Sequence, residues 1–331
     1  MKSNLDLVND TDGFPYGDGP ITVNGQGLFT LLWHDADGDY PIGYVLDRVV
    51  DELARLPASL TGSMQADRAA RTLRMFQDLS SEPSRTAAVA ALTQHLREHD
   101  TFPLLRGWRD ELWPVHGRRG ELLFSVERAA VGLFGAVRYG VHLTAYVEDT
   151  SAAPHGIRIW VPRRAATKST FPGMLDNTVA GGLTTGEDPF ECVVREADEE
   201  ASLPEAVVRA GARPVGALTY MYVTEGPGNG EAGYVYPEVE WAYDLRLDKD
   251  VVPRPKDGEV DEFYLCDVDT IKRDMARGEY KPNCALVMLD FFIRHRILTE
   301  DEEPQLAEIQ RRMHRELPFP GPHWSNWRSS T

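Results

Sequence analysis

Residues 181–203 read GGLTTGEDPFECVVREADEEASL and carry the clearest pattern in this 331-residue chain. Asp188 is a residue type that caps helix N-termini, and Pro189 suits the first helical position. Glu191 follows the cap by three residues, which is the spacing of a capping box. The segment therefore predicts a helix that begins near Pro189.

The predicted helix has an apolar face and an acidic face. At about 100° per residue the apolar positions share one arc, which predicts packing on a sheet. These positions are Phe190, Val193, Val194, Ala197 and Ala201. The adjoining arc holds Glu196, Glu199 and Glu200, whose spacing brings like charges together and destabilises a helix. Mg²⁺ binds carboxylates together with substrate phosphates, so the cluster is a candidate metal platform; a solvated acidic face is the alternative.

The acidic cluster belongs to a longer pattern. Gly181, Glu187, Arg195, Glu196, Glu199 and Glu200 fit Gly-x5-Glu-x7-Arg-Glu-U-x-Glu-Glu, with Ala197 at the apolar position U. We expect a chance match in about 10⁻⁴ of chains of this length. The stretch resembles the Nudix box, the signature of the Nudix hydrolases. It departs from the general motif at Ser202, where glycine is usual.

The resemblance implies a fold, an activity and site residues. The implied fold is α/β (α+β), a Nudix α/β/α sandwich with a mixed sheet over residues 121–300. The implied activity is hydrolysis of a diphosphate with Mg²⁺ or Mn²⁺ as cofactor. By motif position the metal ligands would be Glu196, Glu199 and Glu200 together with the Gly181 carbonyl. Glu199 and Glu200 would be catalytic, and Arg195 would orient the glutamates.

The rest of the chain predicts three parts. Residues 1–120 read as a smaller mixed domain, with helices expected at 43–56 and 84–98. From residue 121 strands dominate, beginning at 122–126, and a buried helix is expected at 283–297. Strands interleaved with helices favour the α/β/α arrangement independently of the motif. Residues 301–331 predict a last helix at 302–317 and a tail.

Several segments outside the box suggest a subgroup. Residues 168–177, 200–204, 257–260, 281–285 and 317–320 read KSTFPGMLDN, EASLP, DGEV, KPNCA and LPFP. They look like the thiamine pyrophosphokinase-related Nudix proteins, whose N-terminal domain is uncharacterised. The implied reaction removes phosphate from thiamine diphosphate, and preferentially from damaged forms such as oxothiamine diphosphate, leaving the monophosphate.

Further candidates concern the substrate. Lys168 and Asn177 are candidate phosphate contacts, one as a point charge and one as a neutral donor, although Lys168 is equally well read as a surface lysine. Glu259 is the candidate base or additional metal ligand, with Glu262 as its rival and a solvated turn as the alternative. Ring stacking could involve an aromatic set on the later strands: Tyr220, Tyr222, Tyr234, Tyr236 and Trp241.

Charge and cysteine content restrict the partners and the compartment. The formal charge of −17 disfavours nucleic acid and membranes, and it requires local cations wherever an anionic diphosphate binds. Three scattered cysteines fit a cytoplasmic protein. The expected partner is a small-molecule diphosphate, and a homodimer stays open.

Three alternatives remain at this point. The substrate could be a nucleoside diphosphate derivative, or the chain could be a Nudix-fold binding module without turnover. An isomerase on the same fold would call for a reactive cysteine, for which Cys192 is placed on the box helix.

Overall fold

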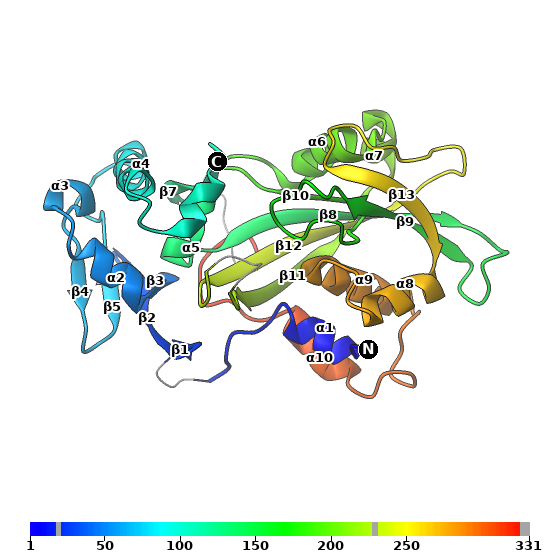
Figure 1. The fold of residues 1–331 in the computed structure, drawn as a ribbon, viewed down its shortest axis with the longest axis horizontal. Coiled ribbons are helices and arrows are strands. Elements are labelled where there is room, and N and C mark those ends of the chain that lie inside the picture. The colour runs from blue at the N-terminus through cyan, green and yellow to red at the C-terminus, as the bar shows by residue number, and fades with distance from the viewer. Residues whose placement is uncertain (18–20, 227–230, 325–331) are drawn as a thin grey trace.

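The computed structural model describes residues 1–17, 21–226 and 231–324, so residues 325–331 of the expected tail lie outside the described part. The N-terminal region has two small sheets (Figure 1). In the first, β2 pairs with β1, β3 and β5, and β4 pairs with β5; β6 and β7 form a separate hairpin. The elements are α1 (Asn4–Asn9), β1 (Thr22–Val23), β2 (Gln26–Asp35), β3 (Gly38–Leu46), α2 (Asp47–Leu53), α3 (Ala58–Thr61), β4 (Gln65–Asp67), β5 (Thr72–Arg74), α4 (Glu82–Glu98), η1 (Pro103–Gly107), β6 (Leu112–His116), β7 (Leu122–Glu127), η2 (Arg128–Ala130) and α5 (Val131–Phe134).

The second region is built on a six-stranded mixed sheet in the order β11-β12-β8-β9-β13, with β10 paired to β8. Strands β12 and β8 are parallel, and the other pairs are antiparallel. The elements are β8 (Arg138–Glu148), β9 (Ile157–Arg164), β10 (Val179–Gly182), α6 (Pro189–Ala201), α7 (Glu205–Gly211), β11 (Arg213–Val223), β12 (Val235–Arg246), β13 (Val260–Asp267), α8 (Val268–Ala276), α9 (Pro282–Arg294) and α10 (Leu306–Met313).

Helices cover both faces of this sheet. Helices α6 and α7 lie on one face, and α8 and α9 lie on the other, where α1 and α10 pack beside α9 (Figure 1). The arrangement confirms the mixed sheet between helices that the sequence predicted. It places α6, the box helix, directly over β8 and β10.

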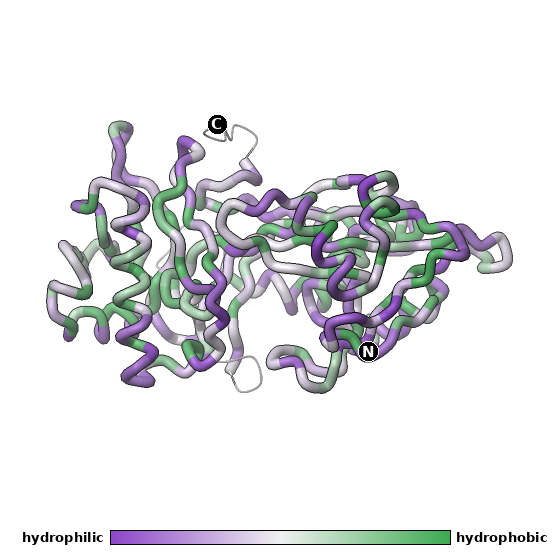
Figure 2. Tube along the Cα trace, turned by 90° about the horizontal axis from the view of Figure 1, so that it is seen from above, coloured by the Kyte–Doolittle hydropathy of each residue, from purple (hydrophilic) through white to green (hydrophobic). Residues whose placement is uncertain are grey.

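The apolar core on the α6 side is continuous between the two regions. One cluster of buried side chains includes Phe29 and Val45 from the first sheet and Val141, Val193 and Val239 from the large sheet and α6. Apolar stretches accordingly run through both halves of the molecule (Figure 2). A second cluster fills the space between the other sheet face and α9. The two regions therefore fold as parts of one packed structure.

Three predicted elements differ from the structure at their ends. The helix expected at 43–56 begins only at Asp47, because residues 43–46 pair with β2. The helix expected at 302–317 spans Leu306–Met313. It stops there because His314 bridges to Thr219 of β11 and the Arg315 N–H donates to the Thr219 carbonyl. The helix expected at 283–297 ends at Arg294.

The domain boundary expected at residue 120 falls inside the β6–β7 hairpin. The predicted strand at 122–126 forms as β7, but it pairs with β6 rather than with the large sheet. The sequence of one short strand does not indicate which other strand it pairs with, and this explains the difference. The hairpin belongs structurally with the N-terminal region, and the large sheet begins with β8.

Ser202 ends helix α6 in a left-handed conformation, with φ 52° and ψ 28°. This is the position where the Nudix motif usually has glycine, the residue that adopts this conformation without steric cost. We expect Ser202→Gly to raise the free energy of unfolding by about 0.5–1 kcal/mol. Urea denaturation of both proteins measures the change. A variant with a lower free energy of unfolding would show that the Ser202 side chain stabilises the fold by more than its left-handed backbone conformation destabilises it.

His116 makes stability depend on pH. Burial lowers its pKa from the ordinary value of 6.5 to about 4, although a hydrogen bond with the Glu121 backbone acts in the opposite direction. The unfolded chain therefore binds a proton at this histidine near pH 6.5, whereas the folded chain binds it only near pH 4. The free energy of unfolding consequently falls as the pH drops from about 6.5 to 4. Between pH 7 and pH 5 we expect this residue to cost about 2 kcal/mol.

The variant His116→Asn removes the titrating group, so its unfolding free energy should fall less between pH 7 and pH 5. Denaturant titrations at both pH values measure the two differences. Because His323 also has a pKa lowered by burial to about 4, some loss of stability should persist in the variant. Equal losses in wild type and variant would contradict the assignment to His116.

Candidate active site

The N-terminus of α6 positions the box residues. The Asp188 carboxylate accepts hydrogen bonds from the backbone N–H groups of Phe190 (2.8 Å) and Glu191 (3.2 Å), so the predicted cap is confirmed. The second contact of the predicted capping box, from the Asp188 backbone N–H to the Glu191 carboxylate, does not form. The Glu191 carboxylate pairs instead with both terminal nitrogens of Arg209 on α7, at 2.8 and 2.7 Å.

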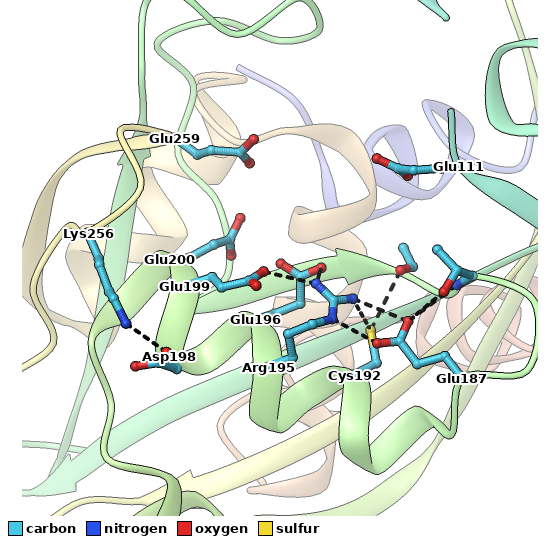
Figure 3. Close-up of polar contacts among 12 residues, drawn as sticks. Glu111, Glu187, Cys192, Arg195, Glu196, Asp198, Glu199, Glu200, Lys256 and Glu259 are labelled. Atoms are coloured by element: carbon cyan, nitrogen blue, oxygen red, sulfur yellow. Dashed lines mark hydrogen bonds and ion pairs between the residues drawn. The ribbon is translucent and has the colours of Figure 1, made fainter. Parts of the chain in front are cut away.

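Arg195 is the centre of an ion-pair network on α6 (Figure 3). Its Nε donates to Glu187 Oε1 at 2.8 Å, and its Nη1 donates to Glu196 Oε1 at 2.8 Å and to Glu199 Oε2 at 3.0 Å. One guanidinium thus fixes three carboxylates, which the fork of N–H donors in arginine allows. This geometry matches the orienting role that the motif implied.

Gly181 allows Glu196 to pack against β10. A Cβ atom at position 181 would lie 2.3 Å from the Glu196 carboxyl group, so any larger residue there would displace Glu196 from its place against the strand. Burial raises the pKa of Glu196 to about 7, against the attraction of Arg195. Gly181 and Gly182 themselves end strand β10.

Glu200 is a buried carboxylate beside Glu196. Its Oε2 accepts a hydrogen bond from the backbone N–H of Ala180 at 3.1 Å. Burial raises its pKa well above the ordinary value, and repulsion from Glu196 and Asp176 acts in the same direction. Two neighbouring buried carboxyl groups that resist ionisation are a place where a bound cation would relieve the cost of their charges.

The candidate donors have the chemistry that Mg²⁺ or Mn²⁺ prefers. They are the Glu196, Glu199 and Glu200 carboxylates and the Gly181 carbonyl, all hard oxygen ligands. Within the described ranges no three acidic, histidine or cysteine side chains already stand close enough to hold a metal ion. Arg195 occupies oxygens of Glu196 and Glu199, so a metal would compete with this guanidinium for them.

A cavity of about 580 Å³ opens in front of these carboxylates. Its walls come from α6, β10, the sheet strands β8, β11 and β12, the N-terminus of α9, and the β6–β7 region. Cations from several segments line it: Arg109, Arg128, Arg138, Arg164, Lys168, Arg195 and Lys281. These side chains provide the local positive charge that a diphosphate requires in a chain with a net charge of −17.

Lys168 and Glu259 form an ion pair at the cavity wall. Burial alone would raise the pKa of Glu259, but the hydrogen bond from Lys168 and the charges of Lys168, Arg164 and Arg109 hold it below its ordinary value. Glu259 is therefore an ionised carboxylate that faces the box glutamates from another segment (Figure 3). Its rival Glu262 is exposed on β13 and is not among the cavity-lining residues.

Asn177 does not reach the cavity, so the expected substrate contact is not supported by its position. It is 1% exposed, its Oδ1 lies 2.8 Å from His142 Nδ1, and its Nδ2 donates to the Cys284 carbonyl at 3.3 Å. The side chain instead holds His142 in the orientation that faces the cavity. The sequence alone does not indicate whether a polar residue near a motif faces the cavity or the core.

The aromatic candidates divide between the cavity and the core. Tyr220, Tyr222 and Tyr236 line the cavity. Tyr234 packs under the Arg48 guanidinium, and Trp241 stacks on Tyr139 with ring centroids 5.7 Å apart. In β12 the cavity-lining positions alternate with core positions, as expected for a strand with one polar face.

Several cavity residues were not singled out from the sequence: Arg109, Glu111, Trp113, Arg138, Arg164, Glu238 and Glu240. A signal existed for two of them, because Glu238 and Glu240 repeat at period two within the apolar strand β12. Arg164 also has a structural role, since it forms a buried ion pair of 2.6 Å with Asp176. Trp113 comes from a different domain and had no local signal.

Cys192 lacks the reactivity that an isomerase would need. Its thiol is fully buried, lies 3.6 Å from the Gly182 carbonyl, and has a pKa raised well above 9 by burial. The thiolate form, which is the nucleophile, is therefore disfavoured.

Within the described residues every helix is too short or too polar to span a bilayer.

A mixed sheet between helices, with a glutamate-bearing helix beside a cation-lined cavity, is the arrangement expected from the resemblance to the Nudix hydrolases. Residues 141–285 match the family model of the NUDIX domain, and residues 38–138 match the Domain of unknown function DUF4743. The chain belongs to the Nudix hydrolase family and is a Nudix hydrolase.

Three relatives resemble the chain over much of its length. An uncharacterized protein of Saccharomyces cerevisiae, YJR142W, is 33% identical over 321 residues, or 96% of this chain and 92% of that protein. Nudix hydrolase 20, chloroplastic, of Arabidopsis thaliana is 33% identical over 83% of this chain and 71% of its own length. Nudix hydrolase 24, chloroplastic, from the same plant is 36% identical over 73% and 62%. Since the plant names refer to the chloroplast, the cytoplasmic compartment stays a prediction.

Proposed function

We propose that this Nudix hydrolase uses Mg²⁺ or Mn²⁺ to hydrolyse thiamine diphosphate, or damaged forms such as oxothiamine diphosphate, to the monophosphate and phosphate. The carrying observation is that four of the five segments that resemble the thiamine-related subgroup, 168–177, 200–204, 257–260 and 281–285, contribute residues to the cavity wall. Lys168, Phe171, Asp257, Glu259 and Lys281 belong to those segments, and all line the cavity. Segments far apart in sequence thus gather around the box carboxylates.

The site residues have two proposed roles, metal binding and phosphate contact. Glu196, Glu199, Glu200 and the Gly181 carbonyl would hold the metal, with Arg195 positioning the carboxylates. When bound, Mg²⁺ or Mn²⁺ neutralises phosphate oxygens and lowers the pKa of water. Lys168 supplies a further positive charge that can contact a phosphate oxygen.

Glu259 is the proposed base. Its carboxylate is held ionised beside Lys168 and faces the box glutamates, so it can accept a proton from the attacking water. The water oxygen forms a bond to one phosphorus as the bond from that phosphorus to the bridging oxygen breaks. The bridging oxygen leaves with the other phosphate.

Product analysis with purified protein tests the proposal. The substrates are thiamine diphosphate, oxothiamine diphosphate, ADP-ribose and a nucleotide sugar, each with Mg²⁺, Mn²⁺ or excess EDTA. We expect inorganic phosphate and a thiamine-type monophosphate with either metal, and no product with EDTA.

Other outcomes separate the alternatives. Turnover of the nucleotides alone would contradict the thiamine assignment and favour a nucleoside diphosphate derivative as substrate. Absence of turnover with every substrate would favour a binding module, although Glu187, Glu196, Glu199 and Glu200 are all present.

A further inference from the structure

The β6–β7 hairpin of the N-terminal domain is fixed against the box loop. The Thr185 N–H donates to the Leu112 carbonyl at 2.8 Å, and the Thr185 and Ser125 hydroxyls are 2.9 Å apart. A Cβ atom at Gly182 would lie 2.7 Å from the Trp113 ring, so the box strand and the hairpin are in close contact. The hairpin therefore forms a wall of the active-site cavity rather than a separate surface.

Trp113 presents an unsatisfied donor at this wall. The side chain is 3% exposed and lines the cavity, and its indole Nε1 has no hydrogen-bond partner among the described residues. The guanidinium groups of Arg128 and Arg138 lie over its ring, at 5.4 and 5.3 Å from the centroid. Buried N–H groups are rarely left without an acceptor, because the lost hydrogen bond is costly. An acceptor atom on a bound ligand that reached this wall would satisfy the donor.

The sheet strands supply a polar wall of opposite character. The Tyr220 hydroxyl donates to Glu238 at 2.6 Å and lies 3.2 Å from Glu240, and both carboxylates are more than nine-tenths buried. A Cβ atom at Gly140 would lie 2.1 Å from Glu240 Oε2, so the strand β8 leaves space for this side chain. Arg138 joins the two walls, since it pairs with Glu238 at 3.3 Å and also lies over Trp113.

The charges of these walls separate the two ends of a substrate. A metal held by the α6 carboxylates, together with Lys168, would bind the diphosphate, which leaves the ring toward Glu238 and Glu240, whose charges are offset by Arg138 at 3.3 Å and His142 at 3.4 Å. Carboxylate oxygens accept hydrogen bonds from N–H groups, and an indole N–H donates to an acceptor. Together they complement a nitrogen heterocycle that carries both N–H donors and acceptor atoms.

We propose that the N-terminal domain is part of the active site, and that Trp113, which lines the same cavity as Glu238 and Glu240, binds with them the nitrogen-heterocycle end of the diphosphate substrate. This inference rests on the proposed function for the identity of the ring, which would be the pyrimidine shared by thiamine and oxothiamine diphosphate. It gives residues 38–138 a role in substrate selection.

Kinetics of Trp113→Phe test the hairpin wall, because phenylalanine keeps an aromatic ring and removes the N–H. With thiamine diphosphate we expect KM to rise about 10-fold with kcat little changed. With methyl diphosphate, which has no ring, KM should be unchanged. Trp108→Phe is the matched control, since the Trp108 indole N–H is already bonded to Asp110 at 2.8 Å and the side chain does not line the cavity.

Glu240→Gln tests the sheet wall independently of the hairpin. It should likewise raise KM for thiamine diphosphate and leave methyl diphosphate unaffected, and thermal denaturation verifies that each variant is folded. Equal KM changes for both substrates, or none for either, would overturn the inference.

The two proposals fail in different ways. If wild type hydrolyses only nucleotides, the proposed function fails, while the same variants with the accepted nucleotide still test the walls. If nothing is hydrolysed, calorimetric titration with thiamine monophosphate replaces the assay. Weaker binding to Trp113→Phe would then support the inference, and equal binding, or no binding to wild type, would overturn it.

Discussion

Replacing Glu200 by glutamine is expected to lower kcat about 10³-fold without lowering the free energy of unfolding. The carboxylate is proposed as a metal ligand, and its loss removes stabilisation of the charge that develops on the phosphate oxygens. Folding should not suffer, because burial already disfavours the charged form of Glu200, and a neutral amide of the same shape avoids that cost. Phosphate release with saturating Mg²⁺ and urea denaturation measure the two quantities.

Asp198 provides the matched control on the same helix. Its carboxylate turns away from the cavity toward Lys256, whose Nζ lies 2.7 Å from Oδ2 (Figure 3). Asp198→Asn removes the same charge from α6 and should leave kcat within about twofold, since exposed ion pairs contribute little. A comparable loss of activity in both variants would mean that the net charge of α6, and not metal binding at Glu200, is responsible.

Arg195→Lys should raise the Mg²⁺ concentration for half-maximal rate and lower kcat, each by about 10- to 100-fold. Lysine keeps the charge but cannot bond Glu187, Glu196 and Glu199 together, because an ammonium group lacks the planar fork of donors. We also expect the free energy of unfolding to fall by about 1–2 kcal/mol, less than for a fully buried pair because the Arg195 side chain is 38% exposed.

Arg209→Lys is the comparison for this prediction. Arg209 makes a similar two-pronged contact with Glu191, also on α6, but on the exposed side. The variant should keep the wild-type metal dependence. If Arg195→Lys changed stability alone, Arg195 would be a structural residue that does not position the metal ligands.

The box helix could be predicted closely because its signals are local. Asp188, Pro189 and the period of the apolar residues fix the start and the buried face of α6 without reference to the rest of the chain. The placement of Arg195 among glutamates follows from helical spacing in the same way. Lys168 and Glu259 were separate candidates from the sequence, and the structure pairs them at the cavity wall.

What could not be predicted depends on contacts between distant segments. Trp113 reaches the cavity only because β6 and β7 pair and dock on the box loop. Asn177, which precedes β10, faces the core because His142 on β8 bonds it there. The early end of α10 has the same cause, since Thr219 of β11 captures the chain after Met313. Such long-range pairings leave no periodic trace in the participating segments.

The hairpin also limits how this protein can be recombined. It packs on α4 on one side and hydrogen-bonds to the box loop on the other. A chimera joined at residue 120 would divide the hairpin, and one joined at residue 138 would split a core that includes Phe134 and Val141. Exchange of the N-terminal domain between relatives should therefore succeed only when the facing surfaces are exchanged with it. The two domains therefore have to be exchanged or altered together.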